Sequence, residues 1–162
     1  MRQVNMLLSL VIMIMLAGCG GDGKAESSEA YSYLKNKGYQ NVKWHGDGVQ
    51  YVLNEEMLTR MPDMVEWGLM EGIDPADYIG KTIEVERFKA IGSLAIEGEF
   101  IASVFLTDGK PIGGTETVVD INGDGMFTED GMFSLPSGKP LRSISGKSFE
   151  EWQRDWLDRY GG

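Results

Sequence analysis

The chain has 162 residues, a formal net charge of −10 and 42% hydrophobic residues, with one Cys and one His. This length suits a single domain, and the hydrophobic fraction excludes a wholly disordered chain. A single Cys excludes an internal disulfide framework and a metal site built from several Cys residues. The acidic balance argues against a nucleic-acid-binding protein, because phosphate binding requires clustered Lys and Arg side chains.

The N-terminal segment has the pattern of a secretory signal. Arg2 precedes a 13-residue stretch, Met6 to Gly18, that contains no charged side chain. A helix of that length spans about 20 Å, which is less than the roughly 30 Å of a bilayer core. A charged start, an apolar middle and small residues at the end indicate a signal peptide that is removed from the mature protein.

This segment ends in Leu16, Ala17, Gly18 and Cys19. These four residues resemble the lipobox of bacterial lipoproteins, which is a Leu, a small residue, a Gly or Ala, and a Cys. The resemblance implies cleavage after Gly18 and a diacylglyceryl group on the sulfur of Cys19, with acyl chains such as palmitate. Two acyl chains give stable anchoring where one gives only marginal binding. The resemblance therefore implies a lipid-anchored protein of the cell membrane that faces outside the cytoplasm.

Three segments are predicted in the whole chain. Residues 1–18 are the lipoprotein signal peptide. Residues 19–28 are the lipidated Cys and a tether, because residues 20–28 contain only Gly, Ala, Ser and charged residues, a composition typical of flexible linkers. Residues 29–162 are expected to form a single globular domain.

The domain is predicted to begin with a helix and a β-hairpin. A serine that can cap the first turn precedes a helix expected over residues 29–37, and a glycine suited to the left-handed C′ position follows it. Residues 42–45 and 49–53 are two strand-like runs on either side of a Gly-Asp-Gly sequence. Because this sequence favours a tight turn, we predict that the two runs pair as a hairpin.

Two short helices and several strands are expected next. Asn54 can cap a helix, and Pro62 either interrupts it or begins a second helix that ends before Gly72. Asp108 and Gly109 are a strong hairpin signal between two of the strands. The strands are expected over residues 81–88, 99–106, 111–119 and 132–135.

The last element is predicted to be an amphipathic helix. Ser148 and Glu151 have the spacing of a capping box at its start. One face carries the large apolar residues Phe149, Trp152, Trp156, Leu157 and Tyr160. This face either packs on the sheet or binds a partner. The whole pattern predicts an α+β fold, in which helices pack on one face of an antiparallel sheet of four to six strands.

Three segments of the domain have a recognisable pattern. Residues 34–39 read Leu-Lys-Asn-Lys-Gly-Tyr, residues 72–81 end in Tyr-Ile-Gly-Lys, and residues 102–114 end in Lys-Pro-Ile-Gly-Gly. Over about residues 31–117, this order of helix, Gly-Tyr turn, strand entry and hairpin resembles a group of small lipoprotein domains of unknown function in Gram-positive bacteria. The resemblance implies no activity, because none is assigned to that group.

One segment begins like a calcium-binding loop. Asp120, Asn122, Asp124 and Gly125 fit positions 1, 3, 5 and 6 of the pattern Asp-x-Asn-x-Asp-Gly. Calcium is bound by about six to eight oxygen ligands, and the glycine permits the sharp turn that lets them converge. The further candidate ligands are the carbonyl of Met126 and the side chains of Thr128, Glu129 and Asp130.

The end of this loop departs from a standard EF-hand. Position 12, where a bidentate acid belongs, is Gly131, and the acids Glu129 and Asp130 come earlier. Asn-Gly and Asp-Gly are also the leading turn dipeptides of β-hairpins. The segment is therefore either a shortened calcium loop or a plain turn.

Other chemistry is not indicated by the local sequence. His45 is the only imidazole, and its neighbours in the sequence do not form a metal or catalytic group with it, so we expect a surface histidine. Many carboxylates are present, but no spacing singles out one pair.

These features predict a lipid-anchored extracytoplasmic lipoprotein that acts as a non-enzymatic binding or adaptor module. Its expected partners are the membrane, through the lipid anchor, and an envelope protein or a wall component. A calcium-stabilised structural module and a carboxylate-dependent cell-wall hydrolase are the two alternatives. Calcium is the one cofactor that the sequence suggests.

Overall fold

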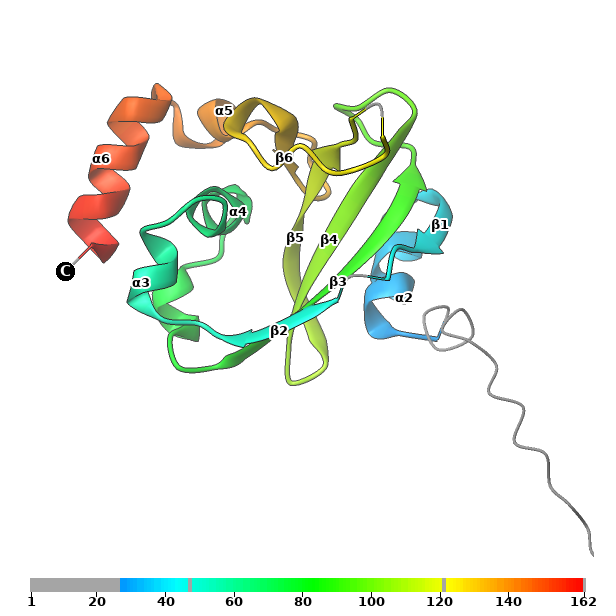
Figure 1. Cartoon of the computed structure of the whole chain (residues 1–162), viewed down its shortest axis with the longest axis horizontal. Helices are drawn as coiled ribbons and strands as arrows, with labels where there is room; N and C mark the ends of the chain where they lie inside the picture. The colour runs from blue at the N-terminus through cyan, green and yellow to red at the C-terminus, as the bar shows by residue number, and fades with distance from the viewer. Residues whose placement is uncertain (1–26, 47, 121, 162) are drawn as a thin grey trace, which may run out of the picture.

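A six-stranded antiparallel sheet forms the centre of the domain (Figure 1). The computed structural model describes residues 27–46, 48–120 and 122–161. The strands run in the order β1-β3-β4-β5-β6, and β2 also pairs with β3. Their bounds are β1 (Gln40–Trp44), β2 (Val49–Val52), β3 (Thr82–Ile91), β4 (Glu99–Thr107), β5 (Lys110–Val118) and β6 (Met132–Ser134).

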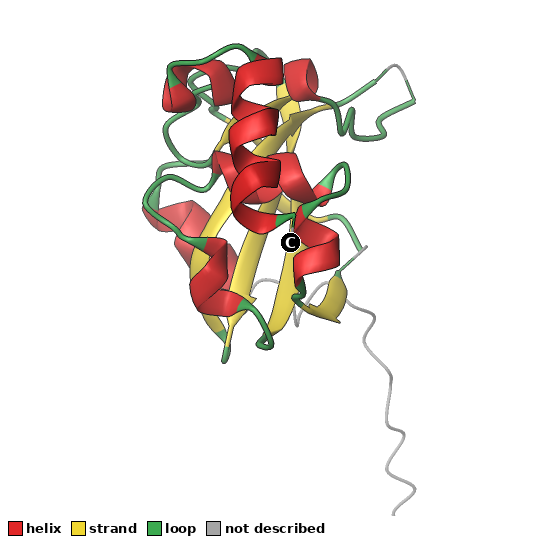
Figure 2. Ribbon diagram, turned by 90° about the vertical axis from the view of Figure 1, so that its left-hand side faces the viewer, coloured by secondary structure: helices red, strands yellow, loops and turns green. Residues whose placement is uncertain are grey.

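Helices cover both faces of this sheet (Figures 1 and 2). The α-helices are α2 (Glu29–Asn36), α3 (Glu55–Leu58), α4 (Asp63–Leu69), α5 (Leu141–Ser145) and α6 (Phe149–Tyr160). Two 3₁₀ turns are η1 (Pro75–Tyr78) and η2 (Glu129–Gly131). The α+β class, the antiparallel sheet and the C-terminal helix are confirmed. The predicted layer on one face consists of α3 to α6, and α2 adds a cover on the opposite face.

The central strand β4 shows why both faces are covered. Residues 100–106 are all buried, and successive side chains of a strand point to opposite faces. Ala102 and its neighbours on one face pack with Leu34 of α2. Phe105, on the other face, packs with Trp67 of α4. A continuous apolar run such as β4 is therefore the sequence signature of a strand buried on both sides.

The predicted hairpin around Gly46 is wrong. Among the described residues, β1 and β2 pair with β3 and not with each other, and they lie end to end along its edge. Trp44 is opposite Phe88, and Val49 is opposite Val85. Between these two pairs, the edge segment that joins β1 to β2 advances by five residues, whereas the matching part of β3 advances by three residues. The glycine-containing segment therefore interrupts one edge strand in the manner of a β-bulge.

The helix-capping signals and the turn signal at Asp108 and Gly109 are confirmed. The Ser28 hydroxyl accepts a hydrogen bond from the Tyr31 N–H at 3.1 Å, and the Asn54 side chain accepts one from the Met57 N–H at 3.0 Å. The capping box at the start of α6 has both of its hydrogen bonds. The β4–β5 turn has φ angles of +50° and +71° at Asp108 and Gly109, as a type I′ hairpin requires.

Candidate functional site

The predicted lipidation site, Cys19 with cleavage after Gly18, lies outside the described residues, as do the tether up to residue 26 and the signal peptide. Within the described part of the chain, every helix is too short or too polar to cross a bilayer. Lipid anchoring therefore stays a prediction.

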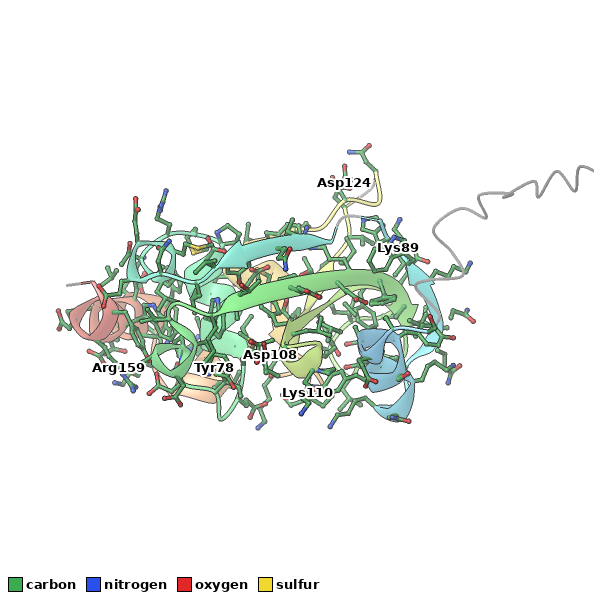
Figure 3. All side chains as sticks on the ribbon, turned by 90° about the horizontal axis from the view of Figure 1, so that it is seen from below. Tyr78, Lys89, Asp108, Lys110, Asp124 and Arg159 are labelled. Carbon is green, nitrogen blue, oxygen red and sulfur yellow. The ribbon has the colours of Figure 1, made fainter. Side chains whose placement is uncertain are left out.

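The predicted calcium loop forms a tight turn that projects from the domain (Figure 3). Asp120 closes this turn, because its Oδ1 accepts hydrogen bonds from the backbone N–H groups of Asn122 at 2.8 Å and Asp124 at 3.0 Å. Its Oδ2 accepts from the Asn122 amide at 3.3 Å. These hydrogen bonds lower the pKa of Asp120, the one from the Asp124 N–H being the largest cause. The loop thus brings positions 1, 3 and 5 of the motif together in either interpretation.

In the second half of the loop, Met126 lies close to Thr128 and Gly131. The Met126 carbonyl accepts a hydrogen bond from the Thr128 N–H at 2.8 Å. A Cβ at Gly131 would lie 2.4 Å from the Met126 carbonyl oxygen, so glycine at position 12 permits the close approach of these two segments. Among the described residues, no group of three or more His, Cys, Asp or Glu side chains is arranged to hold a metal. Calcium binding by Asp120, Asn122, Asp124, Met126, Thr128, Glu129 and Asp130 stays a prediction.

The structure places His45 and Asp124 at one small cavity. This cavity has a volume of about 130 Å³ and is also lined by Arg87, Phe127, Ile101 and Gly125. The Arg87 guanidinium lies 5.2 Å from the centre of the Phe127 ring, a cation–π contact. The His45 N–H donates to the Arg87 carbonyl at 2.9 Å. His45, directly after β1, thus lines one cavity with Arg87 of β3 and Asp124 of the loop, a grouping that the local sequence did not indicate.

A row of polar side chains crosses the sheet beneath α4. Arg87 is opposite Ser103, Ser103 is opposite Thr115, and Thr115 is opposite Ser134. Paired residues of antiparallel strands point to the same face, so these four residues share one face, and we call them the polar row. Ser103 and Thr115 are 0% exposed, and among the described residues their hydroxyls have no hydrogen-bond partner; the same holds for the neighbouring Thr117.

Glu66 of α4 lies in the layer above the polar row. It is 5% exposed, and its Oε1 has no hydrogen-bond partner among the described residues. Burial, the largest cause, raises the pKa of the Glu66 carboxyl to about 7; Arg87 lowers it and Asp63 raises it. Burial also raises the pKa of Tyr51 on β2, with a contribution from the charge of Glu66. A buried acid with a perturbed pKa is the kind of group that marks candidate functional sites.

An aromatic groove of about 300 Å³ lies between α4, α5 and α6. Its lining includes Trp152, Trp156 and Tyr160, whose ring centres are 5.1 Å and 4.6 Å apart in succession. The Trp156 Nε1–H donates to the Leu58 carbonyl at 2.7 Å, which fixes this ring. A Cβ at Gly68 would lie 2.5 Å from the Trp152 ring, so only a glycine lets α4 approach α6 this closely. The aromatic face of α6 is thus partly core and partly open.

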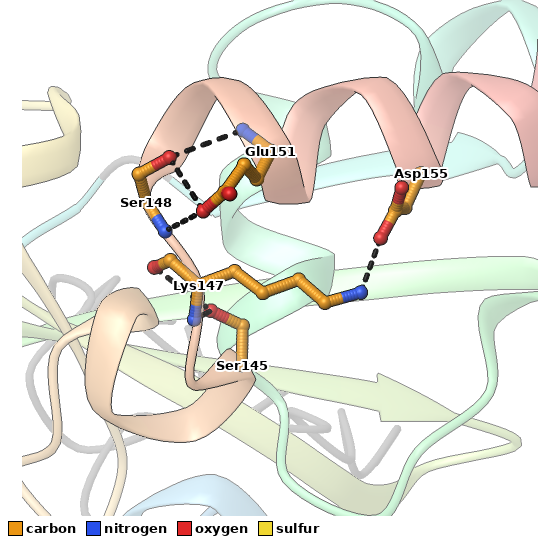
Figure 4. Close-up of polar contacts among 5 residues, drawn as sticks. All are labelled: Ser145, Lys147, Ser148, Glu151 and Asp155. Atoms are coloured by element: carbon orange, nitrogen blue, oxygen red, sulfur yellow. Dashed lines mark hydrogen bonds and ion pairs between the residues drawn. The ribbon is translucent and has the colours of Figure 1, made fainter.

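Charged residues are among those that line the aromatic groove. Lys147 extends beside α6 and forms an ion pair with Asp155, next to the capping box (Figure 4). Arg159 forms an ion pair with Asp74, whose other oxygen accepts a hydrogen bond from the Tyr160 hydroxyl at 2.8 Å. The groove therefore combines an apolar floor with donors and acceptors at its edge, which is typical of ligand sites.

Sequence reasoning missed the Glu66 and Arg87 positions. One signal was available, since Glu66 is an acid inside the apolar run Met64 to Leu69. Arg87 follows Ile83 and Val85 at a spacing of two, so a strand assignment alone puts its side chain on their buried face.

Comparison of the chain with family models, with curated proteins and with solved structures finds no match.

Proposed function

We propose that this protein is a lipid-anchored extracytoplasmic lipoprotein that acts as a non-enzymatic binding or adaptor module. The lipobox residues support the anchor. The observation that carries the binding role is the aromatic groove, which has an apolar floor and paired charges at its rim. The net charge of −10 adds to this, because an acidic domain is repelled by anionic lipid and is held away from the membrane surface.

The groove supports a binding role more strongly than the acidic residues support the hydrolase alternative. Asp63 and Glu66 are neighbouring acids on α4 that influence each other. Glu66 is buried under that helix, however, so a wall polymer cannot reach it in this conformation. The groove, in contrast, is open at the surface and lies on the layer that α3 to α6 form.

A photo-crosslinking amino acid at Lys147 tests this proposal in cells. Lys147 is at the groove rim, so we expect a discrete adduct with an envelope protein or a wall component, identified by mass spectrometry. Leu94 is a matched control position, because it is 82% exposed and lies outside the groove. Equal adducts from both positions, or none from Lys147, would contradict the proposal.

A calcium-stabilised structural module is the second candidate. The observation that favours it is the turn around Asp120, which holds the motif positions 1, 3 and 5 close together. In this role the ion would make the loop rigid and would not take part in a reaction.

A further inference from the structure

The region between α4 and the sheet contains an uncommon concentration of unpaired polar atoms. The Oε1 of Glu66 and the hydroxyls of Ser103, Thr115 and Thr117 are buried and have no hydrogen-bond partner among the described residues. An unpaired buried polar group costs about 1–3 kcal/mol, and a buried charge costs more. A charged Glu66 therefore costs this layer more than a neutral one.

The groups that face Glu66 determine what happens when it ionises. Asp63, on the same helix, is an acid that opposes ionisation, and Arg87 on β3 favours it. Burial is the largest cause that raises the pKa of Tyr51 on β2; Glu66 and Asp63 also raise this pKa, and Arg87 lowers it. The side of α4 that faces β5 and β6 meets hydroxyls and apolar residues such as Met132, which supply no positive charge. Among the described residues, Arg87 thus favours ionisation of Glu66, and Asp63, whose own pKa burial raises and Arg60 lowers, opposes it.

We infer that Glu66 is a proton-binding site that controls the packing of α4 on the sheet. With the proton bound, the carboxyl is neutral and can donate a hydrogen bond within the layer, so α4 is held down. When the proton leaves, the carboxylate has to be hydrated, and α4 loosens.

The aromatic groove gives this movement a consequence. Gly68 is two residues after Glu66 on α4, lines the groove, and is packed directly against the Trp152 ring. Loosening of α4 therefore removes one wall of the groove. The acidity around the domain thereby changes the shape of the groove, whose role in binding rests on the proposed function.

Hydrogen exchange followed by mass spectrometry tests the inference on the full chain in detergent, at pH 5 and at pH 8. A carboxyl with a pKa of about 7 is mostly protonated at pH 5. At pH 8 its ionised form outnumbers its protonated form about tenfold. After correction for the intrinsic exchange rate, protection of residues 63–69 should fall at pH 8, by up to roughly two orders of magnitude. Residues 29–36 of α2, on the opposite face, should be unchanged.

Three variants identify the titrating group. Glu66→Gln is always neutral, so α4 should be equally protected at both pH values. Asp63→Asn removes the acid that opposes ionisation, so the loss of protection should move to lower pH. Glu55→Gln is the matched control, because Glu55 is an exposed acid on α3, and it should behave as wild type.

Two results would overturn the inference. One is wild-type protection of α4 that does not differ between pH 5 and pH 8. The other is a pH dependence that persists in Glu66→Gln. If Glu66→Gln does not fold, the shift in Asp63→Asn decides the question, since an unchanged midpoint there rules out Glu66 as the group.

Discussion

Two buried carboxyls on opposite faces of the sheet are held in different ways. Glu116 of β5 is 0% exposed and accepts one hydrogen bond on each oxygen, from the hydroxyls of Tyr39 and Ser93. Burial raises the pKa of Glu116, and these two hydrogen bonds lower it. In the described part of the chain, the Oε1 of Glu66 has no hydrogen-bond partner. Burial thus raises the pKa of both carboxyls, but only at Glu116 do hydrogen bonds act against that rise.

Replacing Tyr39 by Phe tests the structural role of Glu116. The change removes one donor and leaves a buried carboxyl oxygen unpaired, so the free energy of unfolding should fall by about 1–3 kcal/mol in urea denaturation at pH 7. It should also raise the pKa of Glu116 further, because that hydrogen bond lowers it. Tyr33→Phe is the control, since the Tyr33 hydroxyl makes no hydrogen bond among the described residues. A loss of equal size in both variants would refute the assignment.

At the scale of elements, signals that act within one helix or one turn predicted the structure correctly. The pairing of strands that are distant in the sequence was predicted wrongly around Gly46. Serine and asparagine caps act within one helical turn, and the type I′ dipeptide acts within one hairpin, so α2, α3, α6 and the β4–β5 turn could be predicted from adjacent residues. The segment around Gly46 has similar residues, but whether the chain reverses there depends on β3, which is about 40 residues later. Partner strands cannot be identified from turn residues alone.

The candidate site was hidden for the same reason. Glu66, Arg87 and Ser103 are far apart in the sequence, and the signals of burial at Glu66 and Arg87 do not show that these residues meet. They share a layer only because the register of β3 and β4 puts Arg87 opposite Ser103 and because α4 packs over that row. Spacing rules find sites within one element, whereas this one is built from three.

The loop after β5 can be tested as an element. If it binds calcium with millimolar affinity, as extracellular modules often do, then 10 mM calcium should stabilise the domain by about 1.4 kcal/mol, and the melting temperature should rise by a few degrees. Asp124→Ala should abolish that rise. Asp124 is the better choice than Asp120, whose carboxyl also closes the turn.

Asp158→Ala is the control for this experiment, because it removes an exposed acid from α6 and leaves the loop unchanged. Its calcium response should equal that of the wild type. A melting temperature that does not respond to calcium in any of the three proteins identifies the segment as a plain turn.

At the scale of the whole molecule, the two faces of the sheet divide the roles. The helix α2 begins directly after the predicted tether and covers one face, with Ala30 and Leu34 in its core. The aromatic groove and Glu66 belong to the layer on the other face. An anchor attached before α2 would therefore leave the α3–α6 layer free to meet a partner, and it would not obstruct the movement of α4.

Replacing Cys19 by Ser tests the anchor itself. The lipobox resemblance makes this sulfur the only acylation site, since the chain has one Cys. We expect Cys19→Ser to lose incorporation of labelled palmitate and to move from the membrane fraction to the released fraction. Adding Ser27→Cys to this variant is the control, because a thiol outside the lipobox should not restore labelling. Continued labelling of Cys19→Ser, or recovery with the displaced thiol, would show that the lipobox does not direct acylation.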